Sequence, residues 1–147
     1  MITRATLDHL SALVALEKSL FPKDDFPLSR GSFSYHIRKN DLFVFMNEGE
    51  VAGYILWLKR KTYYRLYSLG VSKQFRGKGI AKELLSYSFE RLKSPSYTLE
   101  VKTTNESAIS LYEKFGFTKQ KILKGFYPNN RDGYLMRRQE NDETQKL

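Results

Sequence analysis

The sequence predicts an α+β fold, in which one mixed sheet carries helices on both faces. Three observations support this fold class. The N-terminal third contains one strand-like run and two amphipathic helix-like runs. Three strand-like runs joined by short turns follow, as in an antiparallel meander. The last half alternates strands and helices as a βαβα segment and ends in an antiparallel pair, so the expected order is β-α-α-β-β-β-α-β-α-β-β rather than that of a doubly wound sheet.

The first six elements are bounded by recognisable start and stop signals. Thr6 and Ser29 can cap the two helices, because short hydroxyl side chains accept the free N–H groups at a helix start. Phe21-Pro22 ends the first helix, and Gly49 suits the left-handed position of a hairpin turn. The expected ranges are 2–5 (strand), 7–20 and 29–39 (helices), and 42–46, 51–58 and 63–71 (strands).

The later elements are bounded in the same way. Ser94-Pro95 breaks a long amphipathic helix, Thr104 or Asn105 caps the next one, and Gly116 stands where a left-handed C-terminal cap is expected. The expected ranges are 78–93 (helix), 97–101 (strand), 105–115 (helix), and 117–125 and 133–137 (antiparallel strands). We expect a single domain over residues 1–138 and a polar, frayed tail over residues 139–147.

The composition excludes several classes of protein. The 147 residues include no cysteine, which excludes disulfides, thiolate metal sites and a cysteine nucleophile. His9 and His36 are the only histidines and lack the spacing of metal ligands, so no metal is expected. No apolar run approaches the roughly 20 residues that span a bilayer, and no signal peptide is apparent. We therefore expect a cytoplasmic protein without a membrane partner.

The net charge of +9 predicts attraction to anions. The cations are spread along the chain rather than gathered in one block, and no nucleic-acid-binding module is recognisable. A basic nucleic-acid-binding domain is therefore only a remote alternative, and no direct contact with nucleic acid is expected.

The most informative stretch lies between the third meander strand and the helix-like run that follows it. It reads Gln74-Phe75-Arg76-Gly77-Lys78-Gly79-Ile80-Ala81. Two glycines one residue apart let a ligand approach bare backbone, and the N–H groups and dipole at a helix start favour an anion. Four cations surround the same point: Lys73, Arg76, Lys78 and Lys82. The stretch predicts a phosphate site, in particular one for a pyrophosphate; the alternative is a structural turn with solvated charges.

Two common nucleotide motifs do not match this loop. The P-loop string G-x-x-x-x-G-K-[ST] is absent from the chain. A dinucleotide fingerprint needs a third glycine, but Gly77-Lys78-Gly79 is followed by Ile80-Ala81-Lys82.

Gln74-x-x-Gly77-x-Gly79 is instead similar to the Q/R-x-x-G-x-G/A signature of the GCN5-related N-acetyltransferases (GNAT family). A second motif runs from Leu99-Glu100-Val101-Lys102-Thr103-Thr104-Asn105 through Ala108 to Leu111-Tyr112-Glu113-Lys114-Phe115-Gly116-Phe117. It resembles L-E-V-R-x-x-N-x-x-A-x-x-L-Y-x-x-x-G-F of the ribosomal-protein-alanine acetyltransferase (RimI-like) group. Phe21-Pro22 and Gly125-Phe126-Tyr127-Pro128 resemble two further elements of that group. The resemblance spans residues 1–138 and departs from the pattern at Lys102, where Arg is usual, and at Phe126, where Tyr is usual.

The resemblance implies the GNAT fold and an enzyme that transfers acetyl from acetyl-CoA to an amine. In the family, the loop amides hold the cofactor pyrophosphate, and the backbone of the preceding strand pairs with the pantetheine arm at a splayed, bulged strand end. Carried over position by position, the cofactor site is Leu69, Gly70, Val71, Gln74, Phe75, Arg76, Gly77, Lys78, Gly79, Ile80, Ala81, Asn105, Ala108 and Tyr112. Asn105 is either a helix cap or a ligand of the pantetheine arm, or both.

Direct acyl transfer to an amine needs a base for the amine and an acid for the departing thiolate. Alternation along the strand places Glu100 on the face opposite Leu99 and Val101, as a general base or as the salt-bridge partner of a nearby lysine. Tyr112 lies two turns into its helix, and its ordinary pKa near 10 suits a general acid. The alternative for Tyr112 is a core position on an amphipathic helix.

The acceptor is the least determined part of the prediction. A protein N-terminal α-amine is favoured by the RimI-like resemblance, and a small-molecule amine or a lysine side chain is the alternative. The acceptor pocket is expected to be lined by Phe21, Pro22, Tyr35, Phe126 and Tyr127. We expect a monomer or a weak homodimer.

Overall fold

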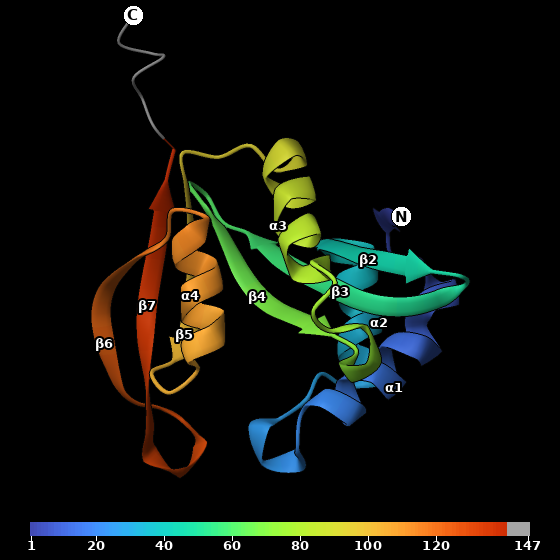
Figure 1. Cartoon of the computed structure of the whole chain (residues 1–147), viewed down its shortest axis with the longest axis horizontal. Coiled ribbons are helices and arrows are strands. Elements are labelled where there is room, and N and C mark those ends of the chain that lie inside the picture. Colours follow the sequence, from blue (N-terminus) through green and yellow to red (C-terminus); the bar gives the residue numbers. More distant parts are fainter. Residues whose placement is uncertain (141–147) are drawn as a thin grey trace, which may run out of the picture. The chain divides into compact units, whose positions relative to one another are not determined.

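The computed structural model describes residues 1–140 and shows four α-helices and seven strands among them (Figure 1). The strands are β1 (Ile2–Arg4), β2 (Asp41–Asn47), β3 (Glu50–Lys59), β4 (Tyr64–Val71), β5 (Ser96–Lys102), β6 (Thr118–Tyr127) and β7 (Arg131–Gln139). The helices are α1 (Leu10–Leu20), α2 (Arg30–Lys39), α3 (Ile80–Arg91) and α4 (Glu106–Lys114). The order of elements matches the prediction, and the α+β class is confirmed.

The chain divides into two compact units. The first contains Met1–Lys59 and Leu66–Leu92, and the second contains Arg60–Arg65 and the chain from Lys93 onwards. Strand β4 contributes to both. The strand order is β1-β2-β3-β4 in the first unit; in the second, the first residues of β4 are followed by β5, β7 and β6.

The sheet of the first unit packs on both of its faces. Alternation along β2 and β3 directs Val44, Tyr54 and Leu56 into a core formed with α1 and α2. The opposite face carries Phe43 and Trp57, whose rings contact Tyr87 and Phe89 of α3. Helices α1 and α2 thus lie on one side of these strands and α3 on the other (Figure 1).

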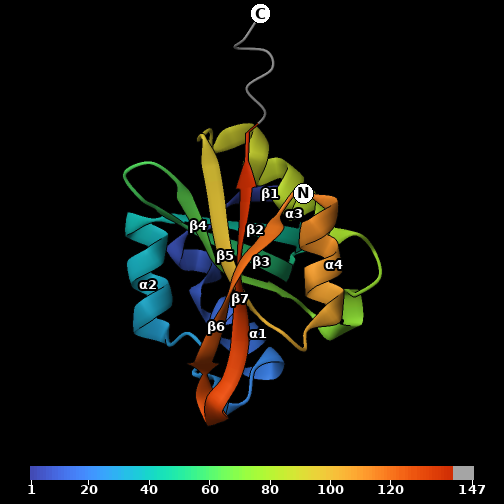
Figure 2. The same ribbon diagram turned by 90° about the vertical axis from the view of Figure 1, so that its left-hand side faces the viewer.

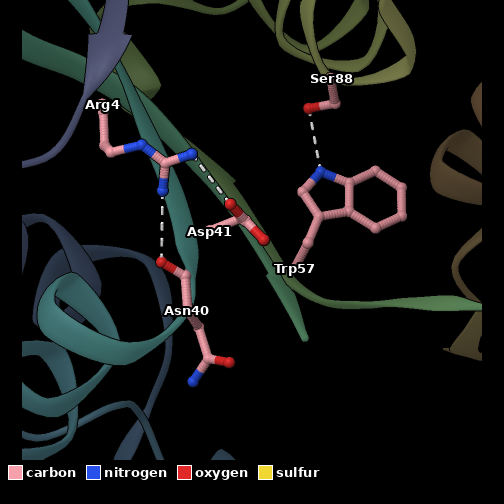
Figure 3. A network of polar contacts seen from close by, with 5 residues as sticks. All are labelled: Arg4, Asn40, Asp41, Trp57 and Ser88. Carbon is pink, nitrogen blue, oxygen red and sulfur yellow. Dashed lines mark hydrogen bonds and ion pairs between the residues drawn. The ribbon is translucent and has the colours of Figure 1, made fainter. Parts of the chain in front are cut away.

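Buried polar groups of the first unit are paired with one another. The Trp57 indole Nε1–H donates to Ser88 Oγ at 2.9 Å (Figure 3). The Ser88 hydroxyl donates to the Leu84 carbonyl oxygen at 2.7 Å. Nearer the surface, Arg4 Nη2 donates to Asp41 Oδ1 at 2.9 Å. The Trp57 bond fixes the rotation of α3 against β3, and with it the direction in which α3 begins.

The second unit packs one helix against an antiparallel sheet. Strand β7 pairs with both β5 and β6, with Glu100 opposite Leu135 and Ile122 opposite Tyr134 (Figure 2). Strand β6 ends the strand order, and its residues 118–122 are exposed. Three lysines lie along it: Lys119, Lys121 and Lys124. The α4 residue Tyr112 meets Phe117 edge-on, with ring centroids 5.9 Å apart.

Several boundaries differ from the prediction for local reasons. The first helix opens with a 3₁₀ turn, Leu7–His9, before α1. Helix α3 begins at Ile80 rather than residue 78, because Gly79 takes a left-handed conformation with φ of 78°. Of the two expected caps, Asn105 caps α4. Strand β7 extends to Gln139, and the predicted tail lies, from residue 141, outside the described residues. None of the helices within residues 1–140 is long and apolar enough to cross a membrane.

Ser88→Ala should lower the free energy of unfolding by about 1–3 kcal/mol, because the buried Trp57 N–H loses its acceptor. Urea unfolding followed by circular dichroism measures the change. The matched control is Ser86→Ala on the exposed side of the same helix, which should stay within about 0.5 kcal/mol of wild type. Equal stability of the two variants would contradict this assignment of the Trp57 bond.

Candidate functional site

The glycine loop leaves the end of β4 as an exposed stretch of backbone. After a 3₁₀ turn over Lys73–Phe75, Gly77 and Gly79 both have φ near +79°. A Cβ placed on either glycine would meet nothing within 4 Å. Glycine is therefore required at both positions by the backbone conformation, which side chains disfavour, while the space above the loop stays open.

Helix α3 starts without a capping side chain. Its N-cap is Gly79, and no side chain accepts a hydrogen bond there, while buried Ile80 anchors the first turn in the core. The Lys78 ammonium lies 6.0 Å from the centroid of the Phe75 ring, and Arg76 Nε donates to the Val71 carbonyl oxygen at 3.4 Å. Uncapped N–H groups at a helix start with cations beside them fit a bound pyrophosphate.

The strand before the loop is held by close packing. A Cβ on Gly70 would lie 2.8 Å from Leu20 Cδ1 and 2.8 Å from Tyr54 Cε1, so the position admits no side chain. The N–H of Ser72 donates to the Ala52 carbonyl oxygen at 2.8 Å. Leu69 and Val71 are half-buried on the same strand. These contacts place the strand end; the bulge expected there stays a prediction.

Glu100 lies in β5 and forms an ion pair within the second unit. Its Oε1 accepts hydrogen bonds from Arg65 Nε at 3.0 Å and from Arg65 Nη2 at 2.7 Å. The salt-bridge interpretation is thus confirmed, with an arginine in place of the expected lysine. Both bonds engage the same oxygen, Oε1. Sequence analysis missed Arg65, although it is the one charged residue in β4.

Tyr112 is a buried phenol with 9% of its surface exposed. Burial raises its pKa well above the ordinary value of 10.0, and the neighbouring Tyr127 acts in the same direction. The side chain is therefore protonated at neutral pH. Tyr112 thus occupies the core position that was the alternative interpretation, and its role as a general acid stays a prediction.

Tyr127 interacts electrostatically with Glu100. Burial raises the pKa of Tyr127 to about 12; the charge of Glu100 acts in the same direction, and that of Arg65 opposes it. The ring lies against Gly133, where a Cβ would come within 2.8 Å of Tyr127 Cε2. We call Arg65, Glu100, Tyr112 and Tyr127 the Glu100 cluster, because these four groups of the second unit act on one another through these bonds and charges.

Asn105 caps α4 with one atom of its amide. Its Oδ1 accepts the Ala108 N–H at 3.2 Å, which confirms the capping interpretation. The Nδ2 group is the part of the side chain with which Asn105 can also bind a ligand.

The residues expected to line an acceptor pocket fall into two groups. Phe21 and Pro22 begin the loop of residues 21–28 between α1 and α2, and Tyr35 lies on α2 with 52% of its surface exposed. These belong to the first unit. Phe126 and Tyr127 belong to the second, with ring centroids 5.0 Å apart. Across residues 1–140, no group of three or more histidine, aspartate or glutamate side chains is arranged to hold a metal ion.

The chain is similar in sequence to known acetyltransferases. Residues 10–117 match the family model described as Acetyltransferase (GNAT) family. The chain is 32% identical to an N-alpha-acetyltransferase of Saccharolobus solfataricus, over 93% of this chain and 91% of that protein.

Solved structures show the same fold. The ribosomal-protein-S18-alanine N-acetyltransferase of Escherichia coli has a TM-score of 0.86 at 23% identity, over 95% of this chain and 92% of that chain. Arabidopsis thaliana Naa50, solved with the bisubstrate analogue CoA-Ac-MVNAL, has a TM-score of 0.81 at 24% identity, over 95% and 98% of the two chains. The predicted GNAT fold is confirmed by these matches, and the RimI-like resemblance by 30% identity to the N-alpha-acetyltransferase RimI of Mycobacterium tuberculosis, over 55% of this chain and 52% of that protein.

The raised pKa of Tyr127 predicts a loss of stability in alkaline solution. Above pH 10.0 the unfolded phenol loses its proton while the folded one, with a pKa of about 12, keeps it, so stability falls as the pH rises through this window. Tyr127→Phe should show a shallower fall in the free energy of unfolding, measured by urea unfolding from neutral pH upwards. Exposed Tyr35→Phe is the control and should follow wild type. Identical slopes for Tyr127→Phe and wild type would show that this phenol titrates as it does in the unfolded chain.

Proposed function

This chain belongs to the GNAT family of acetyltransferases, and we propose that it transfers acetyl from acetyl-CoA to the α-amine of a protein N-terminus. As a member of the family it is an acetyl-CoA-dependent acyltransferase. The observation that carries the choice of acceptor is the 32% identity to an N-alpha-acetyltransferase along nearly the whole chain. The likeness to a ribosomal-protein-alanine enzyme supports an acceptor of the kind found on a ribosomal protein.

The chain's own residues suit the cofactor. When bound, acetyl-CoA would supply the acetyl group as a thioester, and CoA would leave as the thiolate that needs a proton. We assign the loop N–H groups at Gly77 to Ala81 and the cations of Arg76 and Lys78 to the pyrophosphate. Backbone N–H groups of residues 69–71 would polarise the acetyl carbonyl, as in an oxyanion hole. Asn105 would hold the pantetheine arm through Nδ2 while its Oδ1 caps α4.

Glu100 is the proposed general base. The ion pair with Arg65 fixes the carboxylate through Oε1, which leaves Oε2 to take the amine proton directly or through a water. An α-amine has an ordinary pKa near 8, whereas a lysine side chain has one near 10.4. At neutral pH an α-amine therefore gives up its proton to a base more readily than a lysine side chain does. This difference favours the N-terminal acceptor over a lysine.

Tyr112 is the proposed general acid. Its burial keeps the phenol protonated until the thiolate departs, because the raised pKa prevents earlier loss of the proton. The proposed direct transfer therefore uses an acid and a base that both belong to the second unit.

The acceptor class is tested by following thiol release from acetyl-CoA with a panel of amines. The panel contains peptides with free N-terminal Ala, Ser or Met, the same peptides with a blocked N-terminus and an internal lysine, and a polyamine. We expect turnover on free N-termini only, with mass spectrometry placing the acetyl group on the α-amine. Turnover on the polyamine or the blocked peptides alone would show that the acceptor is a small-molecule amine or a lysine side chain. No turnover on any peptide would contradict the proposal.

Tyr112→Phe should lower kcat by about 10²–10⁴-fold while leaving acetyl-CoA affinity nearly unchanged, because it removes the proton donor and keeps the buried ring. Single-turnover kinetics and equilibrium binding of CoA separate the two effects. The control is Tyr97→Phe, a buried tyrosine of β5 outside the Glu100 cluster, which should retain kcat. An unchanged kcat for Tyr112→Phe would leave Tyr112 as a core residue only.

A further inference from the structure

Glu17 is a buried acid that the proposed chemistry does not use. It lies in α1 with 2% of its surface exposed. Burial raises the pKa of its carboxyl above the ordinary value, although bonds from Tyr54 and Leu28 act in the opposite direction. A carboxyl group held in such surroundings usually costs stability compared with an apolar residue of the same size. Its presence therefore calls for a role that an apolar residue cannot fill.

The carboxylate joins three other segments of the first unit. Glu17 Oε2 accepts the backbone N–H of Leu28 at 2.8 Å, and Oε1 accepts the Tyr54 hydroxyl of β3 at 2.5 Å. The Tyr54 oxygen lies 2.6 Å from Ser68 Oγ of β4. Since the single phenol proton of Tyr54 goes to Glu17, Ser68 is the donor to Tyr54. The chain of bonds runs from β4 through β3 to α1 and meets the loop at Leu28.

The two ends of the 21–28 loop are held in different ways. At the start, the Phe21 N–H donates to the Glu17 carbonyl oxygen at 3.0 Å as the last backbone bond of α1; at the end, the Leu28 N–H donates to the Glu17 carboxylate. Between them, Phe26 has 78% of its surface exposed and a left-handed φ of 51°. That conformation is unfavourable for a phenylalanine and persists only where the surroundings hold it. The loop thus depends on anchors at its two ends.

We propose that Glu17 is a positioning residue for the acceptor, fixing the 21–28 loop against β3 and β4 at the strand that ends in Leu69, Gly70 and Val71. The proposal rests on the proposed function, which assigns Phe21 and Pro22 to the acceptor side. A carboxylate suits the role because its two oxygens accept from two donors at once, the Leu28 N–H and the Tyr54 O–H. The loop and strand β4 then share one rigid support. This support determines the position of the acceptor peptide relative to the strand end.

The test compares Glu17→Leu with Glu17→Gln. Leucine removes both acceptors, so KM for an N-terminal peptide should rise about five- to thirty-fold, with kcat and the KM for acetyl-CoA nearly unchanged. Glutamine should rescue the peptide KM to within about threefold of wild type, because its oxygen can accept from Leu28 while its amide donates to the Tyr54 oxygen. Exposed Glu90→Leu on α3 is the control for introducing leucine and should leave all three constants unchanged.

Hydrogen exchange gives a readout that needs no activity. The backbone amides of residues 23–28 should exchange faster in Glu17→Leu than in wild type and at the wild-type rate in Glu17→Gln. Tyr54→Phe keeps the ring and the Leu28 bond but cuts the link to Ser68, so it should raise the peptide KM with little change in loop exchange. If Glu17→Leu fails to fold, Tyr54→Phe and Glu17→Gln still test the proposal.

The outcomes separate this proposal from the function on which it rests. Unchanged loop exchange in Glu17→Leu would overturn the anchoring role. Faster exchange with an unchanged peptide KM would overturn the link to the acceptor while leaving N-terminal acetylation intact. Absence of peptide turnover by the wild-type protein would overturn the proposed function, and the exchange data would still decide whether Glu17 anchors the loop.

Discussion

The proposed cofactor site depends on a helix whose first turn is anchored on the inside and left bare on the outside. Ile80 is buried at the start of α3, and the Trp57–Ser88 bond fixes the helix farther along. Gly79 offers no side chain to the N–H groups of the first turn. The core therefore determines where the positive end of the helix dipole points, and the loop adds cations without covering it. An anion can bind there without rearranging the fold.

The second unit holds the groups that we propose for proton transfer, and their surroundings differ. Burial keeps the phenols of Tyr112 and Tyr127 neutral, and Arg65 holds Glu100 as a paired carboxylate. The surroundings raise the pKa of both phenols, and the ion pair with Arg65 orients the Glu100 side chain. The phenol of Tyr112 and the ion-paired Glu100 are the groups to which we assign the acid and the base that acyl transfer to an amine needs.

Local signals in the sequence predicted most of the fold and the backbone conformation of the glycine loop. Gly77 and Gly79, the Asn105 cap and the Gly116 C-cap are recognised from neighbouring residues alone, because each depends on the backbone within one turn. Contacts between distant residues could not be predicted in this way. Arg65 and Glu100 lie 35 positions apart and meet only when β4 and β5 are brought together. Glu17 follows buried Leu16, and nothing in the helical pattern shows that a neighbouring acid is buried as well.

Strand β6 places lysines along an exposed sheet edge, and this has a consequence for a protein whose proposed acceptor is a peptide. An open strand edge presents unpaired N–H and C=O groups to any extended chain, including a nascent protein or a second copy of the same molecule. Burying a lysine ammonium against such a chain is costly, so Lys119, Lys121 and Lys124 discourage unwanted β-pairing. The positive charge that suits the chain to a phosphorylated cofactor thereby also keeps its sheet from acting as a template for aggregation.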